Sequence, residues 1–388
     1  MKLSNFDQRK ALSSSRRIIV KIGTRILVEK TGTPDLVRIR SLIKEMAQLH
    51  HRGKEIILVS SGAIATGMQI LGLKKRPTQL PQLQMVAAVG QVGLMSLYDK
   101  YFTAFRCKIG QVLLTHDDLK NRPRHLNARN TILELLRHKL IPVVNENDVV
   151  SVDEIKFGDN DILASLITIL IEAETLLLLT ATDGLHNSFG TKSASRIPYL
   201  KSVTKNELSM AMGKDNALSQ GGMESKLKSA QAAIHAGARV VIADGRKRNI
   251  ISRILKGEDT GTLIGGSAQD SRSLLNGRKR WIAFFHKTNG TLFIDEGAQK
   301  ALEQNGYSLL AIGIYKIKGH FSKGSLVSVK SADGKLIARG LVDYSSDRLE
   351  KIKGHRTSEI KKILGFKDYD EVIHRDNMVI LKHKDEDR

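Results

Sequence analysis

The sequence Ile141-Pro-Val-Val-Asn-Glu-Asn-Asp148 is followed by Val149-Val-Ser-Val-Asp-Glu-Ile-Lys-Phe157 and then by Gly158-Asp-Asn-Asp161. The apolar run at its start predicts a buried strand, and a second apolar run after Asp161 predicts a helix. Polar side chains therefore stand at the end of one regular element and at the start of another. Because Asn offers a donor and an acceptor, and Asp accepts from an ammonium group, this pattern indicates a site for a small polar ligand.

Ordinary turns and helix caps offer another interpretation of the same residues. Asn, Asp and Gly are common turn formers after a strand, and Asp is a common N-cap before an apolar helix. One or two of these residues are explained in that way. The two turns at 145–148 and 158–161 hold seven Asn, Asp and Glu side chains, which is more than capping needs. Both interpretations stay open on this stretch alone.

Strands and helices are predicted to alternate over the first two thirds of the chain. Runs with strand composition are found at 17–22, 55–59, 111–115, 141–144, 176–179 and 239–243. Segments with helical periodicity separate them. This alternation predicts an α/β fold, a three-layer αβα sandwich with a mostly parallel sheet.

A change of composition separates two domains. Residues 266–277 have the Gly, Ser and Asn content of a linker. Beyond them, short β runs separated by Gly turns, beginning with Trp281 to Phe285, predict a small and mainly β domain. We therefore expect a first domain at 1–270 and a second at 276–381.

The net charge of the chain is +22, which favours anionic partners such as nucleotides, nucleic acids or acidic metabolites. Up to Leu275 there are 40 basic and 25 acidic residues, giving +15, and the remaining residues contribute 22 and 15, giving +7. The excess is thus spread over both parts. A generally basic, solvated surface would look the same, so charge alone does not identify the partner.

Cysteine content and hydropathy indicate a cytoplasmic protein. Cys107 is the single cysteine, which excludes an internal disulfide or a thiolate metal cluster. No run approaches the roughly 18 apolar residues of a membrane span. The first 17 residues are polar and lack the apolar segment of a signal peptide. We expect no membrane partner.

Several polar turns follow strands or open helices and are expected at one edge of the sheet. Ligands of such sheets bind beyond the carboxyl ends of the strands. The segments are Lys21 to Thr24, Ser60 to Gly62, Thr180 to Leu185 and Gln220 to Lys226. Small residues there leave backbone N–H groups at helix starts accessible to an anion. Taken singly, each segment has another interpretation. The lysine can extend to solvent, and the small residues can form a tightly packed turn.

This set of groups is suited to phosphoryl transfer, although the familiar nucleotide motifs are missing. The chain has no Gly-x-x-x-x-Gly-Lys-Ser/Thr loop, no Gly-x-Gly-x-x-Gly after the first strand and no protein-kinase catalytic loop. Two lysines, backbone N–H groups and Mg²⁺ are sufficient to stabilise a moving phosphoryl group. A carboxylate acceptor has a pKa near 4, so it needs no general base at neutral pH.

The order of seven sequence blocks resembles the amino acid kinase family, in the arrangement of its glutamate-phosphorylating members. The blocks lie at 20–24, 61–64, 87–91, 126–129, 145–148, 158–161 and 221–226. The segment from Asn276 to Asp376 resembles a PUA domain, a fold typical of RNA-modifying proteins. Together the two resemblances cover nearly the whole chain, from about Ile18 to Leu381.

The resemblance implies transfer of phosphate from ATP, with Mg²⁺, to the side-chain carboxylate of L-glutamate, the first step of proline biosynthesis. Lys21 and Lys226 would stabilise the transferring group, and Asp161 would orient both lysines. Ser61, Asp148 and Asn160 would bind glutamate, with Asn145 a further candidate. The expected nucleotide contacts are Lys21, Gly23, Thr180, Ala181, Gln220, Gly221, Gly222, Met223, Glu224, Ser225 and Lys226.

The resemblance also implies feedback inhibition by L-proline and a homodimer or homotetramer. The loop from Val149 to Phe157 is expected to sense proline and glutamate together. The sequence departs from the family pattern at Arg25, Ala181 and Gln220, where a small hydroxyl residue, Asp and Thr are usual. These departures lie in or beside the nucleotide turns, and we expect Arg25 to add a phosphate contact.

Two other functions compete with glutamate phosphorylation. A kinase of the same family could act on acetylglutamate, aspartate or a nucleoside monophosphate, but the block at 145–148 and the PUA-like segment favour glutamate. An RNA-binding protein would explain the basic charge and would use the PUA-like domain. Such a protein is expected to cluster basic and aromatic residues, and aromatic residues are only 5% of this chain.

Overall fold

In the computed structural model, the described residues are 5–29, 33–151, 160–187, 194–211, 217–265 and 288–381. The chain divides into two compact units, Met1–Ser273 and Leu274–Arg388. No helix among the described residues has both the length and the apolar content needed to cross a membrane. The loop residues 152–157, the linker at 266–277 and the strand expected at Trp281 to Phe285 lie outside the described residues.

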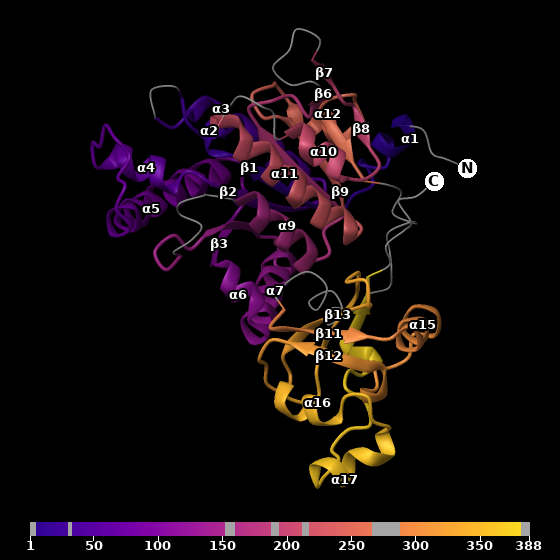
Figure 1. Cartoon of the computed structure of the whole chain (residues 1–388). Helices are drawn as coiled ribbons and strands as arrows, with labels where there is room; N and C mark the ends of the chain where they lie inside the picture. Colours follow the sequence, from indigo (N-terminus) through magenta and orange to yellow (C-terminus); the bar gives the residue numbers. More distant parts are fainter. Residues whose placement is uncertain are drawn as a thin grey trace. The chain divides into compact units, whose positions relative to one another are not determined.

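The N-terminal unit is built on one eight-stranded sheet (Figure 1). Its strand order is β3 (Ile109–Leu114), β4 (Ile141–Glu146), β2 (Glu55–Ser60), β1 (Arg17–Ile22), β5 (Thr175–Thr180), β9 (Arg239–Asp244), β10 (Thr262–Ile264) and β8 (Tyr199–Leu200). The first six strands are parallel, and β10 runs antiparallel to β9. The predicted mostly parallel sheet is therefore confirmed, and its strands are apolar because both faces are covered.

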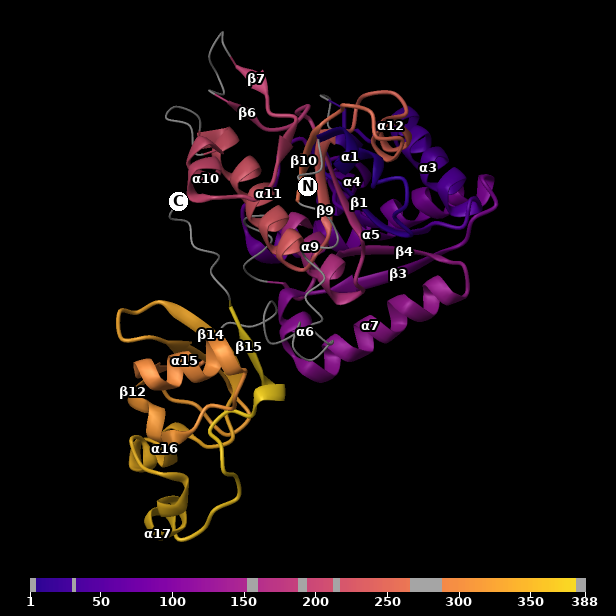
Figure 2. The ribbon, with the colours of Figure 1, turned by 90° about the vertical axis from the view of Figure 1, so that its right-hand side faces the viewer.

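Helices cover both faces of this sheet, which confirms the three-layer sandwich. Figure 2 shows α9 (Asn160–Leu170) and α11 (Ala217–His235) on one side of the strands, with α3 (Leu36–His51) and α12 (Ile250–Leu255) on the other. Helix α7 (Arg122–Arg137) contacts β3 and β4. It begins at Arg122, because the Asn121 side chain accepts from the Arg124 amide at 3.2 Å and caps it.

Two glycines let helices α4 (Ala63–Ile70) and α5 (Leu80–Ala104) meet at their backbones. A Cβ atom on Gly90 would stand 1.8 Å from the Ala63 carbonyl oxygen, and one on Gly67 would stand 1.9 Å from the Val86 carbonyl oxygen. No larger residue fits at either position without moving a helix. The contact fixes the start of α4, which follows β2, against the middle of α5.

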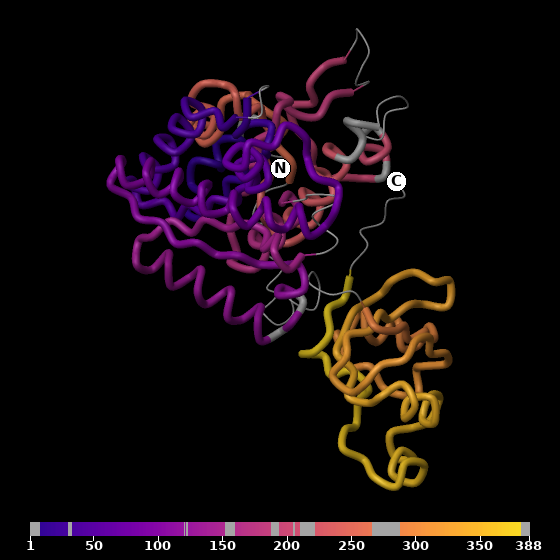
Figure 3. The backbone as a smooth tube through the Cα atoms, turned by 90° about the vertical axis from the view of Figure 1, so that its left-hand side faces the viewer, coloured from indigo at the N-terminus to yellow at the C-terminus, as the bar shows by residue number. Residues whose placement is uncertain are grey.

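The C-terminal unit has its own five-stranded sheet and apolar core, traced in orange to yellow in Figure 3. The order is β12 (Ile314–Lys318), β11 (Gly290–Ile294), β13 (Leu326–Lys330), β14 (Leu336–Leu341) and β15 (Met378–Ile380). Short helices α15 (Glu296–Asn305), α16 (Ser346–Ile352) and α17 (Ile360–Leu364) complete it. The mainly β prediction is confirmed, although β12 was not expected because most of its residues are polar or solvent-facing.

Arg9 joins the first helix, α1 (Asn5–Lys10), to the far end of the sheet. Its side chain is 2% exposed and pairs with Asp259 at 3.0 Å. The guanidinium also donates to the carbonyl oxygens of Pro198, Glu258, Thr260 and Gly261, at 2.7 to 3.1 Å. The guanidinium has five N–H donors, so it can bind carbonyl groups of several separate turns.

We expect Arg9→Ala to lower the free energy of unfolding by about 2–4 kcal/mol, because it leaves several buried carbonyl groups unsatisfied. Arg253→Ala is the matched control, since Arg253 pairs with Glu258 at 2.6 Å on the surface and should contribute less than about 1 kcal/mol. Urea unfolding followed by circular dichroism measures both. Equal losses in the two variants would contradict the tethering role of Arg9.

Candidate active site

A buried carboxylate with two lysine partners lies at the carboxyl edge of the sheet. Lys21, the fifth residue of β1, places its Nζ 2.6 Å from Asp161 Oδ1. Lys226 of α11 places its Nζ 2.8 Å from Asp161 Oδ2. The three side chains are 6%, 13% and 3% exposed. Three elements far apart in the sequence therefore converge on one carboxylate.

The charge of this trio is positive and fixed. Burial alone would raise the pKa of Asp161, but Lys21 and Lys226 outweigh it and hold that pKa below its ordinary value. Asp161 is thus ionised at neutral pH, and the two ammonium groups leave one net positive charge. Such a centre attracts an anion, and its cations are positioned before the anion arrives.

Amide side chains form a second cluster beside the trio. Asn160 precedes Asp161, and its Nδ2 donates to the Ser60 carbonyl at 2.7 Å, to Ser61 Oγ at 3.0 Å and to Asn145 Oδ1 at 2.9 Å. These groups come from α9 and from the ends of β2 and β4, which are adjacent strands. The structure therefore brings together Ser61, Asn145 and Asn160 and links them through the chain to Asp161.

Gln91 of α5 belongs to the amide cluster and was not expected from the sequence. Its Oε1 accepts from Asn145 Nδ2 at 2.8 Å. Its Nε2 is buried and has no hydrogen-bond partner among the described residues. A buried donor without a partner is costly, so this amide is available to an acceptor atom of a ligand. Its position directly after Gly90 was the available signal in the sequence.

Asp148 lies in the turn after β4, near the amide cluster in sequence but outside its hydrogen bonds. Burial raises the pKa of its carboxyl group to about 6, and the charge of Arg76 limits the rise. The carboxylate is therefore ionised at neutral pH only at an energetic cost, which a bound cation would relieve. An amino acid offers such a cation in its ammonium group.

The expected nucleotide residues fall into two groups. Gly23 donates its amide to the Leu179 carbonyl at 3.2 Å, and this contact joins the end of β1 to β5 just before Thr180 and Ala181. Residues 220–226 were expected as a turn, but they lie inside α11, which starts at Ala217. This part of the prediction was wrong, because Gln, Met, Glu and Lys are good helix formers and outweigh two glycines.

Because residues 220–226 are helical, several of their polar groups make contacts along α11. Lys226 Nζ donates to the Gly222 carbonyl at 3.0 Å, one turn earlier. Glu224 pairs with Lys228 at 2.6 Å. The Ser225 hydroxyl is buried without a hydrogen-bond partner among the described residues, and Met223 lies on the same helix. The side chain of Gln220 and the surroundings of Gly221 are outside the described features.

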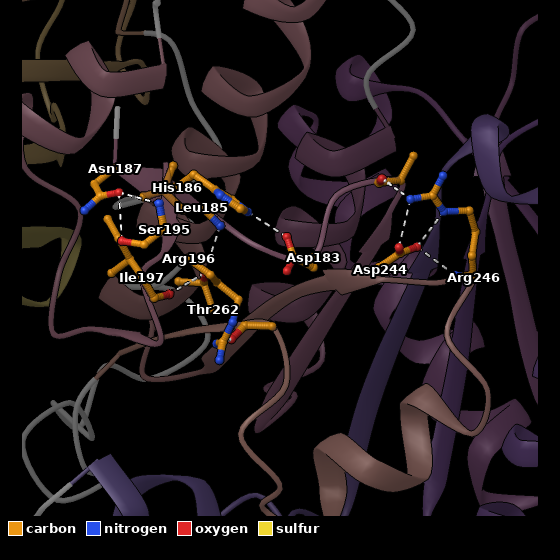
Figure 4. Close-up of polar contacts among 12 residues, drawn as sticks. Asp183, Leu185, His186, Asn187, Ser195, Arg196, Ile197, Asp244, Arg246 and Thr262 are labelled. Atoms are coloured by element: carbon orange, nitrogen blue, oxygen red, sulfur yellow. Dashed lines mark hydrogen bonds and ion pairs between the residues drawn. The ribbon is translucent and has the colours of Figure 1, made fainter. Parts of the chain in front are cut away.

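Polar contacts also join the ends of β5 and β9, which lie on the side of β1 away from β2 (Figure 4). Arg246 Nη2 donates to the Ala181 carbonyl at 2.6 Å and to Asp244 Oδ2 at 2.8 Å, while its Nε donates to Asp244 Oδ1 at 2.8 Å. Nearby, His186 Nε2 contacts Asp183 Oδ1 at 2.6 Å. The Arg246 side chain is 51% exposed, so a fixed cation faces the space beyond these strands.

Comparison with known proteins identifies the family. Residues 16–244 match the amino acid kinase family, and residues 290–364 match the PUA domain. A glutamate 5-kinase of Geobacter sp. (strain M21) is 44% identical over 376 residues, covering 96% of this chain and all of that protein.

Other relatives of the same name match over equally long regions. Those of Moorella thermoacetica and Saccharophagus degradans are 42% and 43% identical and cover 96% and 97% of this chain, which spans 98% and 100% of them. The resemblance seen in the sequence is thereby confirmed. The chain belongs to the amino acid kinase family, among the glutamate 5-kinases that carry a C-terminal PUA domain.

Proposed function

We propose that this protein transfers the terminal phosphoryl group of ATP to the side-chain carboxylate of L-glutamate, giving L-glutamyl 5-phosphate and ADP. The observation that carries the proposal is the pair of lysines on one buried carboxylate, Lys21 and Lys226 on Asp161, beside a cluster of amides. The names of the full-length relatives support glutamate over aspartate, acetylglutamate or a nucleoside monophosphate.

The reaction needs charge stabilisation more than proton transfer. The acceptor carboxylate is already ionised at neutral pH and attacks without a general base. Negative charge spreads over the transferring group, and Lys21 and Lys226 stabilise it there. Asp161 holds both ammonium groups in place, so little reorganisation is required during the transfer. Among the described residues no further acid or base is needed for this step.

The amide cluster is suited to the amino acid. Ser61, Asn145, Asn160 and Gln91 offer both donors and acceptors to the polar groups of glutamate. Asp148 would bind the ammonium group, which would relieve the cost of burying its carboxylate. These assignments rest on residue chemistry and on the hydrogen bonds that join the first four side chains.

The in-line geometry of phosphoryl transfer places the nucleotide opposite glutamate. The attacking and leaving oxygens lie on opposite sides of the phosphorus atom. Glutamate approaches from the β2 and β4 side, so the rest of ATP should extend over the ends of β5 and β9. Those ends lie one and two strands from Lys21, about 5 and 10 Å by sheet spacing. Thr180, Ala181 and Arg246 would therefore meet the nucleotide there.

Mg²⁺ would be held chiefly by ATP itself. No group of three His, Cys, Asp or Glu side chains suitable for a metal ion is found among the described residues, and both Asp161 oxygens already contact lysines. Mg²⁺ commonly binds substrate phosphates and waters with one or two carboxylates. The ion neutralises phosphate charge when bound, and the lysines complete this neutralisation.

The remaining expectations stay predictions from the sequence and the family resemblance. They are inhibition by L-proline, assembly into a homodimer or homotetramer, a cytoplasmic location, an Arg25 contact with phosphate and RNA binding through the C-terminal unit. Most of the loop expected to sense proline, residues 152–157, lies outside the described residues.

We expect purified enzyme to release ADP with L-glutamate and not with L-aspartate or acetylglutamate in a coupled assay. Lys226→Ala should lower kcat more than about tenfold, because it removes a cation from the transition state. Lys228→Ala is the control on the same helix, since Lys228 is 58% exposed and pairs with Glu224. Near-normal turnover in Lys226→Ala would refute its role, and activity with another acceptor alone would refute the substrate.

Asp148→Asn should weaken glutamate binding and, at high pH, stabilise the fold. The folded carboxyl has a raised pKa of about 6, so its charged form opposes folding above that pH, and the native state favours the protonated form below it. The variant should be more stable than the wild type by about 1–3 kcal/mol at pH 8. It should show no gain at pH 4, while the KM for glutamate rises strongly. Urea unfolding at both pH values and initial-rate kinetics measure these effects, and an unchanged KM would contradict ammonium binding.

Arg246→Ala should raise the KM for ATP about tenfold, because a hydrogen bond from a charged donor contributes about 1.5–3 kcal/mol. The KM for glutamate and kcat should change little, since Arg246 lies away from the reacting carboxylate. Arg253→Ala provides the matched removal of a surface arginine. A change confined to the glutamate KM would place the nucleotide elsewhere.

A further inference from the structure

The edge of the N-terminal sheet opposite the active site is strongly basic. The loops that enter β1, β2, β3 and β4, together with the last residue of α7, carry cations at Arg16, Arg52, Lys54, Arg106, Lys108, Arg137 and Lys139, and we call these seven residues the basic edge. Parallel strands begin at a common edge, so topology gathers charges that are scattered over 124 positions of sequence, from 16 to 139.

The strand register sets the cations in a row. Arg17 stands opposite Glu55, so the preceding residues Arg16 and Lys54 lie at the same level on β1 and β2. Ile109 stands opposite Ile141, which brings Lys108 and the loop of Lys139 to neighbouring strands. With β4 between β2 and β3, the row follows four adjacent strands and spans about 15 Å by strand spacing.

Most of this charge is not neutralised within the fold. Arg16 pairs with Glu55 at 2.8 Å, and Arg137 pairs with Glu134. Among the described residues, Lys54 donates only to carbonyl groups of the loop before β1. The other four cations make no ion pair among the described residues, and they are exposed: Arg52, Arg106, Lys108 and Lys139.

Two of these cations occupy backbone positions that favour glycine. Arg106 and Lys139 have φ values of 57° and 55°, and each follows a helix with the same pair of turn hydrogen bonds that surrounds Gly53 and Gly237. A residue other than glycine loses about as much free energy in the left-handed conformation as a cation gains at a helix C-terminus. Folding stability therefore does not account for Arg and Lys at these positions.

The basic edge offers charge but no apolar anchor. None of the exposed large hydrophobic residues of the described chain lies in the four loops, so insertion into a membrane is not favoured there. A polyanion with repeating phosphates is complementary to the row. Because a sheet turns by roughly 20–25° per strand, a flexible single strand follows the row more easily than a stiff duplex.

We propose that the basic edge binds the phosphate backbone of single-stranded RNA without reading its sequence. The bound RNA lies on the N-terminal unit, at the edge of the sheet away from Lys21 and Asp161. Binding and phosphoryl transfer are therefore separate functions, and neither needs the other. The affinity falls steeply with salt, because phosphate contacts release counterions.

Glycine substitutions test the proposal without disturbing the fold. Arg106→Gly with Lys139→Gly removes two charges and places glycine where the backbone favours it. The full-length double variant should bind a labelled oligouridylate of about 12 nucleotides roughly tenfold more weakly in fluorescence polarisation. The slope of log K against log salt should fall by about 1.4, since each single-strand contact contributes about 0.7. Its melting temperature and glutamate kinase activity should not decrease.

Lys74→Ala with Lys201→Ala is the matched control, because both lysines are exposed and lie outside the four loops. This variant has the same net charge as the test variant and should bind RNA like the wild type. Equal weakening in the two variants would show a response to net charge alone and overturn the proposal. Unchanged binding by the glycine variant, or tighter binding to duplex DNA, anionic vesicles or polyglutamate than to RNA, would also overturn it.

Discussion

The sharing of one buried carboxylate by two ammonium groups is the constraint on which the rest of the site depends. Asp161 is 3% exposed and contacts Lys21 and Lys226 at 2.6 and 2.8 Å. A buried charge without partners would cost several kcal/mol, so this contact holds β1, α9 and α11 in one arrangement. The adjacent Asn160 then extends the arrangement to β2 and β4. The charged trio and the amide cluster are thus fixed by consecutive residues of one helix.

The parallel sheet explains why distant residues meet at two opposite edges. Its carboxyl edge gathers the lysines, amides and carboxylates, and its amino edge gathers the exposed cations of the loops. The strands β1, β2 and β4 each have such residues at both ends, separated along the chain by the length of the strand. The collection of charged residues at each edge is therefore a property of topology, and no local run of sequence contains it.

Much of the fold and part of the site could be predicted from residue patterns. The buried strand before Asn145 and the helix after Asp161 followed from hydrophobic periodicity, and the two polar turns indicated a ligand site. The contact of Asn160 with Ser60 and Ser61 could not be predicted from spacing, because it depends on β2 lying next to β4. Arg246 was missed because Asp244-Gly245-Arg246 looks like an ordinary turn. Only the pairing of β5 with β9 brings it to Ala181.

The contact of α4 with α5 has a consequence for substrate size. Ser61 lies just before α4, and Gln91 comes immediately after Gly90, whose Cα leaves no room for a methyl group against the Ala63 carbonyl. The side chains of Ser61 and Gln91 therefore extend from segments whose main-chain atoms, at Ala63 and Gly90, are already in van der Waals contact. The distance between the points where these two side chains are attached is therefore set by the backbone. If the two side chains bind the substrate as proposed, moving them apart for a longer dicarboxylic acid would require rebuilding the helix crossing, while point substitutions would change only the length of the side chains.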